Sequence, residues 1–170
     1  MIPVLRPVYG QEEIDAVAEV LRSGWSGLGP KTAEFERAFA GYLNTDHAVG
    51  TNSGTAALHL AVESLSLRPG DEVLVPALTF VSTAHAVLYA GGTPVFVDVQ
   101  EDTLCMDPAD AARKLGPRTR GIIPVHYAGH PCDMDGIEAL AKDHRLSVIE
   151  DAAHACGASY KGVRVGASKF

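Results

Sequence analysis

The stretch TNSGTAALHLAV (51–62) places small and hydroxylated residues directly before an apolar, alanine-rich helical pattern. The first N–H groups of a helix have no partner within it and lie at the positive end of the helix dipole. Asn52 or Ser53 could satisfy them as an N-cap, which is the commoner arrangement. Alternatively, the helix start at Asn52–Thr55 could bind an anion such as a phosphate in place of a capping side chain. Taken alone, these residues favour the cap.

A second candidate for chemistry is Asp151, which closes the apolar run LSVIED (146–151). Its carboxylate could cap the segment that follows, but a buried carboxylate also needs a cationic or hydrogen-bonding partner. The protonated ring nitrogen of pyridoxal 5'-phosphate (PLP) is one such partner. Glu150 alternates to the opposite face of the strand, and we expect it to be structural. His154 could reach the same ligand if the segment turns helically, although a lone histidine is more often a core or surface residue.

Aromatic and histidine side chains follow two other apolar runs. Phe80 could pack in the core, as most phenylalanines do, or stack on a flat cofactor ring. His126 and Tyr127 end another run and are candidates for lining a substrate cavity. The spacing of His126, His130 and Cys132 invites a zinc interpretation, but no fourth ligand occurs at a standard spacing, so we predict no metal site. GxSxG, GxGxxG and GxxxxGK[ST] motifs are absent, which disfavours hydrolase, dinucleotide-binding and P-loop functions.

The elements that must position these residues alternate between strands and helices. Helical spacing of apolar residues predicts helices at 11–24, 35–43, 54–66, 80–90, 108–115 and 134–144. Apolar, β-branched runs predict strands at 47–51, 71–76, 93–99, 121–127 and 146–151. Such buried strands separated by helices predict an α/β fold with three layers around a mostly parallel sheet.

Ligands of such sheets bind beyond the carboxyl ends of the strands. The segments NSGT, ALTF, HYAGHPCD and EDAAH each follow or end a predicted strand, so they are expected at one edge of the sheet. This coincidence makes a phosphate site at Asn52–Thr55 competitive with a plain cap.

Composition narrows the class of protein. The chain has 170 residues, of which 46% are hydrophobic and 21% charged, and this fits a single soluble globular domain. A net charge of −7 without a basic run argues against nucleic acid or an anionic membrane as the main partner. The sequence shows neither a membrane span nor a signal peptide. Three cysteines without CxxC spacing favour a reduced, cytoplasmic setting.

Seven ordered motifs between Leu5 and Gly166 resemble the DegT/DnrJ/EryC1/StrS family of sugar-nucleotide aminotransferases. They are SGWSGLGPK, FERAFAGYL, NSGTAALHLAV, RPGDEVLVPALTFVSTAHAV, GGTPVFVDV, IIPVHYAGHPCDMDGI and VIEDAAHACGASYKGVRVG. The resemblance implies a PLP-dependent enzyme of the aminotransferase type I fold that works as a homodimer. It is greatest for the branch that aminates 4-keto UDP-sugars.

Carried over to this chain, the resemblance implies a role for each matching residue. Ser53, Gly54 and Thr55 would hold the cofactor phosphate. Phe80 would stack on the pyridine ring, Asp151 would pair with the ring nitrogen, and His154 would approach the phenolic oxygen. The substrate sugar would lie near Trp25, His126 and Tyr127.

The implied reaction is transamination in two stages, from an amino acid donor such as glutamate to a keto-sugar on a nucleoside diphosphate. It needs a Schiff-base lysine, which in the family follows the segment matched by Val165 and Gly166. We expect residues 1–170 to be the N-terminal portion of the PLP-binding large domain, without that lysine, the rest of the large domain and the small domain. Such a chain would be inactive alone. One alternative is a truncated, non-catalytic chain that binds PLP weakly or acts only as a partner of a full-length relative. Another is a PLP-dependent sugar dehydratase of the same family.

Overall fold

The computed structural model describes residues 6–25 and 27–167. It divides into two compact units, which meet in sequence between Gly50 and Thr51. No helix within these described ranges is long and apolar enough to cross a membrane.

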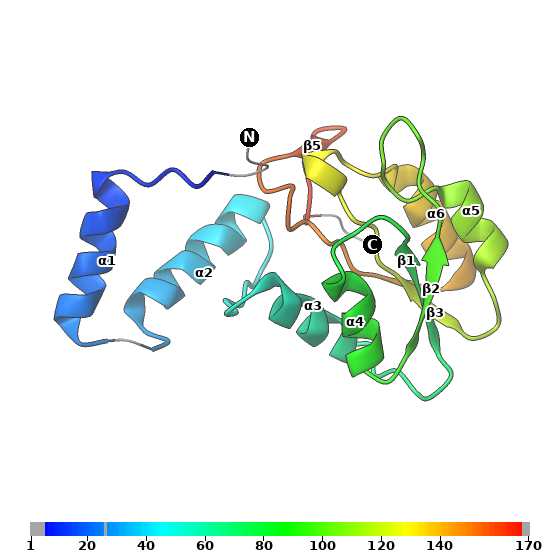
Figure 1. Ribbon diagram of the computed structural model, residues 1–170, viewed down its shortest axis with the longest axis horizontal. Helices are drawn as coiled ribbons and strands as arrows, with labels where there is room; N and C mark the ends of the chain where they lie inside the picture. The colour runs from blue at the N-terminus through cyan, green and yellow to red at the C-terminus, as the bar shows by residue number, and fades with distance from the viewer. Residues whose placement is uncertain (1–5, 26, 168–170) are drawn as a thin grey trace. The chain divides into compact units, whose positions relative to one another are not determined.

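The first unit consists of two helices, α1 (Gln11–Ser23) and α2 (Pro30–Leu43), drawn in blue and cyan in Figure 1. Glu13 accepts the backbone N–H of Gly10 at 2.6 Å and so caps the start of α1. Gly24 ends this helix in the left-handed conformation, at φ 72°, which glycine adopts without steric cost. The helix predicted at 11–24 is therefore confirmed, whereas the second helix begins at Pro30, before its predicted start at 35, because proline is favoured in the first turn of a helix.

The second unit contains a four-stranded parallel sheet in the order β2-β1-β3-β4. The strands are β1 (Glu72–Pro76), β2 (Thr93–Val97), β3 (Thr119–Ile122) and β4 (Ser147–Val148). Its helices are α3 (Gly54–Glu63), α4 (Ser82–Tyr89), α5 (Pro108–Lys114) and α6 (Met134–His144). A 3-10 turn, η1 (Tyr127–Gly129), and a hairpin of β5 (Ser159–Tyr160) and β6 (Val163–Arg164) complete the described elements.

Helices cover both faces of this sheet, which confirms the predicted three-layer α/β architecture (Figure 1). Leu74 of β1 packs in one core with α5 and α6. Its neighbours Val73 and Val75 point to the other face and pack with α3 and α4. This alternation follows from the two-residue period of a strand.

The predicted strand at 47–51 is wrong, because these residues form a loop in the structure. A strand needs a neighbour for its backbone N–H and C=O groups, and none of the described strands pairs with this segment. The prediction for 121–127 was too long for a related reason. Pro124 has no N–H to donate, so the ladder of β3 stops at Ile122 and pairing resumes only as a bridge between Val125 and Asp151.

The buried carboxylate of Asp110 stabilises the second unit through hydrogen bonds and ion pairs. It accepts the backbone N–H of Asp98 at 2.7 Å and pairs with Arg113 at 2.9 Å and Lys114 at 3.1 Å. These contacts, led by the Asp98 N–H, lower the pKa of Asp110 below its ordinary value of 3.8. The carboxylate therefore stabilises the fold above about pH 4, and this stabilisation is lost as the pH falls through the folded-state pKa.

We expect Asp110→Asn to lower the free energy of unfolding of the full-length protein at pH 7 by about 1–3 kcal/mol. The difference from wild type should shrink in urea denaturation as the pH approaches 3. Asp135→Asn, which removes an exposed partner of Lys161, is the control and should change stability little. A difference for Asp110→Asn that stayed constant with pH would contradict the assignment.

Candidate functional site

The N-terminus of α3 carries the residues that the sequence assigned to a phosphate. Ser53 is the N-cap, and its hydroxyl accepts the N–H of Ala56 at 3.1 Å. One capping hydroxyl leaves the preceding N–H groups, those of Gly54 and Thr55, without a partner inside the helix. A Cβ added at Gly54 would meet nothing within 4 Å, so an anion has room to approach there. The cap is therefore present, and it is compatible with an anion site.

The first turn of α4 joins this helix end to Asp151. The hydroxyls of Thr55 and Ser82 lie 2.6 Å apart, which ties α3 to α4. The next residue, Thr83, is fully buried and donates its hydroxyl hydrogen to Asp151 at 2.9 Å. Sequence reasoning missed Ser82 and Thr83 as site residues. The available signal was the presence of two adjacent hydroxyl residues soon after a predicted strand end.

Asp151 is held at the carboxyl edge of the sheet, and its side chain is 6% exposed. Its backbone N–H bonds the carbonyl of Pro124, and its own carbonyl accepts the N–H of His126. Among the residues that the structure describes, the carboxylate accepts only neutral donors, the Thr83 hydroxyl and the Ala153 N–H at 3.3 Å. No ion pair within the described ranges involves it. A nearly buried carboxylate without a cation fits a site that receives a cationic group from a ligand.

Phe80 lies between β1 and α4 and presents an exposed ring. The ring is 69% exposed, although phenylalanine is usually buried. The Phe80 carbonyl accepts the N–H of Thr83 at 3.1 Å, so one turn of backbone links the ring to the residue that bonds Asp151. The structure thus connects Thr55, Phe80 and Asp151 through α4.

Tyr127 and His154 lie together in the same unit. Their ring centroids are 6.1 Å apart with the rings edge to face, and His154 is exposed. The structure describes no further helix after Asp151, so the helical turn expected to carry His154 is replaced by turns. The roles of both residues toward a cofactor or substrate stay predictions.

His126 is fully buried, with both ring nitrogens hydrogen bonded. The backbone N–H of Cys132 donates to Nδ1 at 3.1 Å, so the ring hydrogen belongs on Nε2, which bonds Glu150 at 3.0 Å. Glu150 also accepts the N–H of Gly166 at 3.1 Å, in line with its expected structural role. The prediction that His126 lines a substrate cavity is not tested, but complete burial favours an indirect role, in which His126 holds the segment that carries Tyr127.

Cys132, whose N–H bonds His126, forms a buried thiol pair with Cys105. The hydrogen bond with Cys132 lowers the pKa of the Cys105 thiol to about 6. The same contact, with burial, raises the pKa of Cys132. Within the described ranges, no group of three or more histidine, cysteine, aspartate or glutamate side chains is arranged to hold a metal ion.

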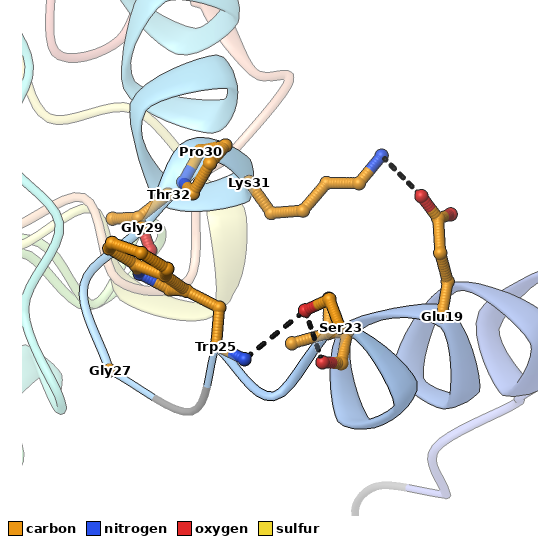
Figure 2. Close-up of a pocket in the computed structure, with 9 residues that line it drawn as sticks. Glu19, Ser23, Trp25, Gly27, Gly29, Pro30, Lys31 and Thr32 are labelled. Atoms are coloured by element: carbon orange, nitrogen blue, oxygen red, sulfur yellow. Dashed lines mark hydrogen bonds and ion pairs between the residues drawn. The ribbon is translucent and has the colours of Figure 1, made fainter.

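Trp25 lies in the first unit, beside a hollow of about 320 Å³ between α1 and α2 (Figure 2). Its indole N–H donates to the Leu28 carbonyl at 2.9 Å. A Cβ at Gly29 would lie 1.9 Å from the ring, so a glycine is required for the indole to lie against the backbone. Lys31 reaches Glu19 across the hollow at 3.8 Å. The substrate role of Trp25 stays a prediction.

A parallel sheet with a helix N-terminus, an exposed aromatic ring and a buried aspartate linked at one edge is typical of the large domain of type I aminotransferases. Residues 7–169 match the model of the DegT/DnrJ/EryC1/StrS aminotransferase family, and the chain belongs to this family. This confirms the resemblance found in the sequence.

Three relatives illustrate the match. The spore coat polysaccharide biosynthesis protein SpsC of Bacillus subtilis is 47% identical over 97% of this chain and 42% of its own. The structure of DesV from S. venezuelae, in complex with a ketimine intermediate, is 49% identical with a TM-score of 0.88, over 93% of this chain and 43% of that one. The "Putative sugar aminotransferase Spr1654" of Streptococcus pneumoniae, in its PMP form, is 38% identical with a TM-score of 0.92, over 98% and 45%. The chain therefore spans less than half the length of these relatives.

Proposed function

We propose that this chain supplies the cofactor-binding half of a PLP-dependent sugar aminotransferase. The observation that carries the proposal is the nearly buried Asp151 carboxylate, which lies at the carboxyl edge of the sheet and has only neutral donors as partners within residues 6–25 and 27–167. Family membership supports the same function.

The described residues fit PLP in three respects. The open N-terminus of α3, with Ser53, Gly54 and Thr55, suits a phosphate. The exposed ring of Phe80 suits stacking on a flat heterocycle, and Asp151 suits a protonated ring nitrogen. When bound, PLP supplies an electron sink for moving an amino group. The chain's own residues bind the phosphate, hold the ring plane and keep the ring nitrogen protonated, with His154 toward the phenolic oxygen.

For the substrates we propose a nucleotide-linked keto-sugar, aminated at the 4-keto position, and an amino acid donor such as glutamate. Trp25 and Tyr127 would contact the sugar nucleotide, and His126 would hold the segment that carries Tyr127. We further propose a homodimer as the working form of the full-length protein.

The proposal is tested by loading the full-length protein with pyridoxamine phosphate and adding a UDP-4-keto-sugar. We expect the mass of an aminated nucleotide sugar, and turnover when glutamate is supplied. Borohydride reduction of the PLP-loaded protein, followed by intact mass, should show one pyridoxyl phosphate per chain. A protein that retains neither cofactor form would overturn the proposed function, and dehydration of the sugar without amination would identify a dehydratase instead.

Thr55→Val tests the phosphate role. We expect it to weaken binding of pyridoxamine phosphate by about threefold to tenfold, the effect of one lost hydrogen bond, with little change in thermal stability. Equilibrium dialysis of the full-length protein measures this affinity.

Ser82→Ala is the matched control, because it breaks the same Thr55–Ser82 hydrogen bond but removes Ser82, to which we assign no contact with the phosphate. It should weaken the cofactor less than Thr55→Val does. Equal effects would mean that Thr55 acts only through its bond to α4, and unchanged affinity in both would leave the segment as a plain helix cap.

A further inference from the structure

Two threonine hydroxyls form a hydrogen-bonded chain that ends on Asp151. Thr79 Oγ1 lies 2.7 Å from Thr83 Oγ1, and Thr83 Oγ1 lies 2.9 Å from Asp151 Oδ2. Thr83 is fully buried, and 68 residues separate it from Asp151 in the sequence. This contact connects the helix after β1 with the end of the LSVIED segment.

The number of hydroxyl hydrogens available determines which group donates in each of these two hydrogen bonds. A hydroxyl has one hydrogen to donate, and Thr83 donates it to the carboxylate. The oxygen of Thr83 must therefore accept the hydrogen of Thr79 in the 2.7 Å contact. Both hydroxyl dipoles are then aligned toward Asp151, and successive bonds of this kind strengthen one another.

The second oxygen of the carboxylate is held more loosely. Oδ1 accepts the Ala153 N–H at 3.3 Å, which is long for an N–H···O bond. An ionised carboxylate can accept about four hydrogen bonds, so Asp151 retains capacity for a further donor. Thr83 thus makes the shorter and more buried of these two hydrogen bonds to the carboxylate.

We propose that Thr83 is a positioning residue, which turns the Asp151 carboxylate toward the ring nitrogen of the bound cofactor. This inference rests on the proposed function. The Thr83 N–H also bonds the Phe80 carbonyl, so Thr83 links the residue that would pair with the ring nitrogen to the residue that would stack on the ring. Thr83 is fully buried, so in this role it acts through Asp151.

The test compares the affinities of two ligands, pyridoxamine phosphate and its 1-deaza analogue, in which C–H replaces the ring nitrogen. Neither ligand forms a covalent bond to a lysine, so equilibrium dialysis with the full-length protein reports the contacts themselves. The variants are Thr83→Val, which keeps the shape and removes the hydroxyl, and Thr83→Ser, which restores the hydroxyl. Thr119→Val is the matched control, because it removes another buried hydroxyl, bonded to the Gly116 N–H at the start of β3.

We expect Thr83→Val to weaken binding of pyridoxamine phosphate by about tenfold and binding of the deaza analogue by less than about twofold. Thr83→Ser should restore the preference for the ring nitrogen, and Thr119→Val should leave it unchanged. Equal losses for both ligands would show a merely structural role and overturn the inference.

The outcome for wild type separates this inference from the proposed function. A wild-type protein that binds both ligands equally, or binds neither, would overturn the role of Asp151 and with it the proposed function. A wild-type preference for the ring nitrogen that persists in Thr83→Val would overturn the positioning role alone.

Discussion

Asp151→Asn is expected to lower the transamination rate of the full-length protein by about 100-fold to 1,000-fold, the effect of removing one preorganised electrostatic group. The amide keeps the shape of the carboxylate and can still accept the Thr83 hydrogen bond, but it carries no charge to pair with a protonated ring nitrogen. Because Asp151 has no cationic partner in the described ranges, losing its charge should cost little stability. Single-turnover kinetics with a UDP-4-keto-sugar and urea denaturation measure the two effects.

Asp110→Asn is the matched control, since Asp110 is as buried as Asp151 but satisfies three donors within the fold. The two substitutions should therefore give opposite results. Asp110→Asn should lower stability and leave the rate nearly unchanged, and Asp151→Asn should do the reverse. A rate within a few-fold of wild type for Asp151→Asn would contradict the role of Asp151 at the ring nitrogen.

The sequence predicted most of the second unit, because its signals are local. Helices expected at 108–115 and 134–144 are found at Pro108–Lys114 and Met134–His144, where an aspartate caps each start. The strand expected at 71–76 is found at Glu72–Pro76, since its apolar residues are buried on both faces. The segment 47–51 has a similar apolar pattern, but a strand also depends on a neighbour, and composition carries no information about the neighbour.

The candidate site was predictable where one residue carries the signal, and it was not where two distant residues share it. Asp151 and Phe80 stand out because each follows an apolar run at a sheet edge. Thr83 does not, because a threonine in the first turn of a helix is common and its partner lies 68 residues away. His126 has the opposite problem. A histidine at a strand end suggests an exposed ligand, whereas here the Cys132 N–H and Glu150 occupy both of its nitrogens.

His126→Ala is expected to lower the free energy of unfolding of the full-length protein by about 3–4 kcal/mol. The substitution leaves a cavity in place of a fully buried ring and leaves the Cys132 N–H without its acceptor. It also removes the bond to Glu150, the carboxylate that holds the Gly166 N–H. Urea denaturation measures the loss, and His130→Ala, an exposed histidine of the same segment, should cost much less.

Two conservative variants separate the two hydrogen bonds of the His126 ring, and they also decide whether this ring contacts the substrate. His126→Asn offers an oxygen in place of Nδ1 for the Cys132 N–H, and His126→Gln offers an N–H in place of Nε2 for Glu150. Each should recover part of the lost stability, because each restores one of the two hydrogen bonds. If His126 acts only by holding the segment that carries Tyr127, the KM for the nucleotide sugar should follow stability across the three variants. A variant with wild-type stability and a KM raised tenfold would show instead that the ring contacts the substrate directly, as the sequence first suggested.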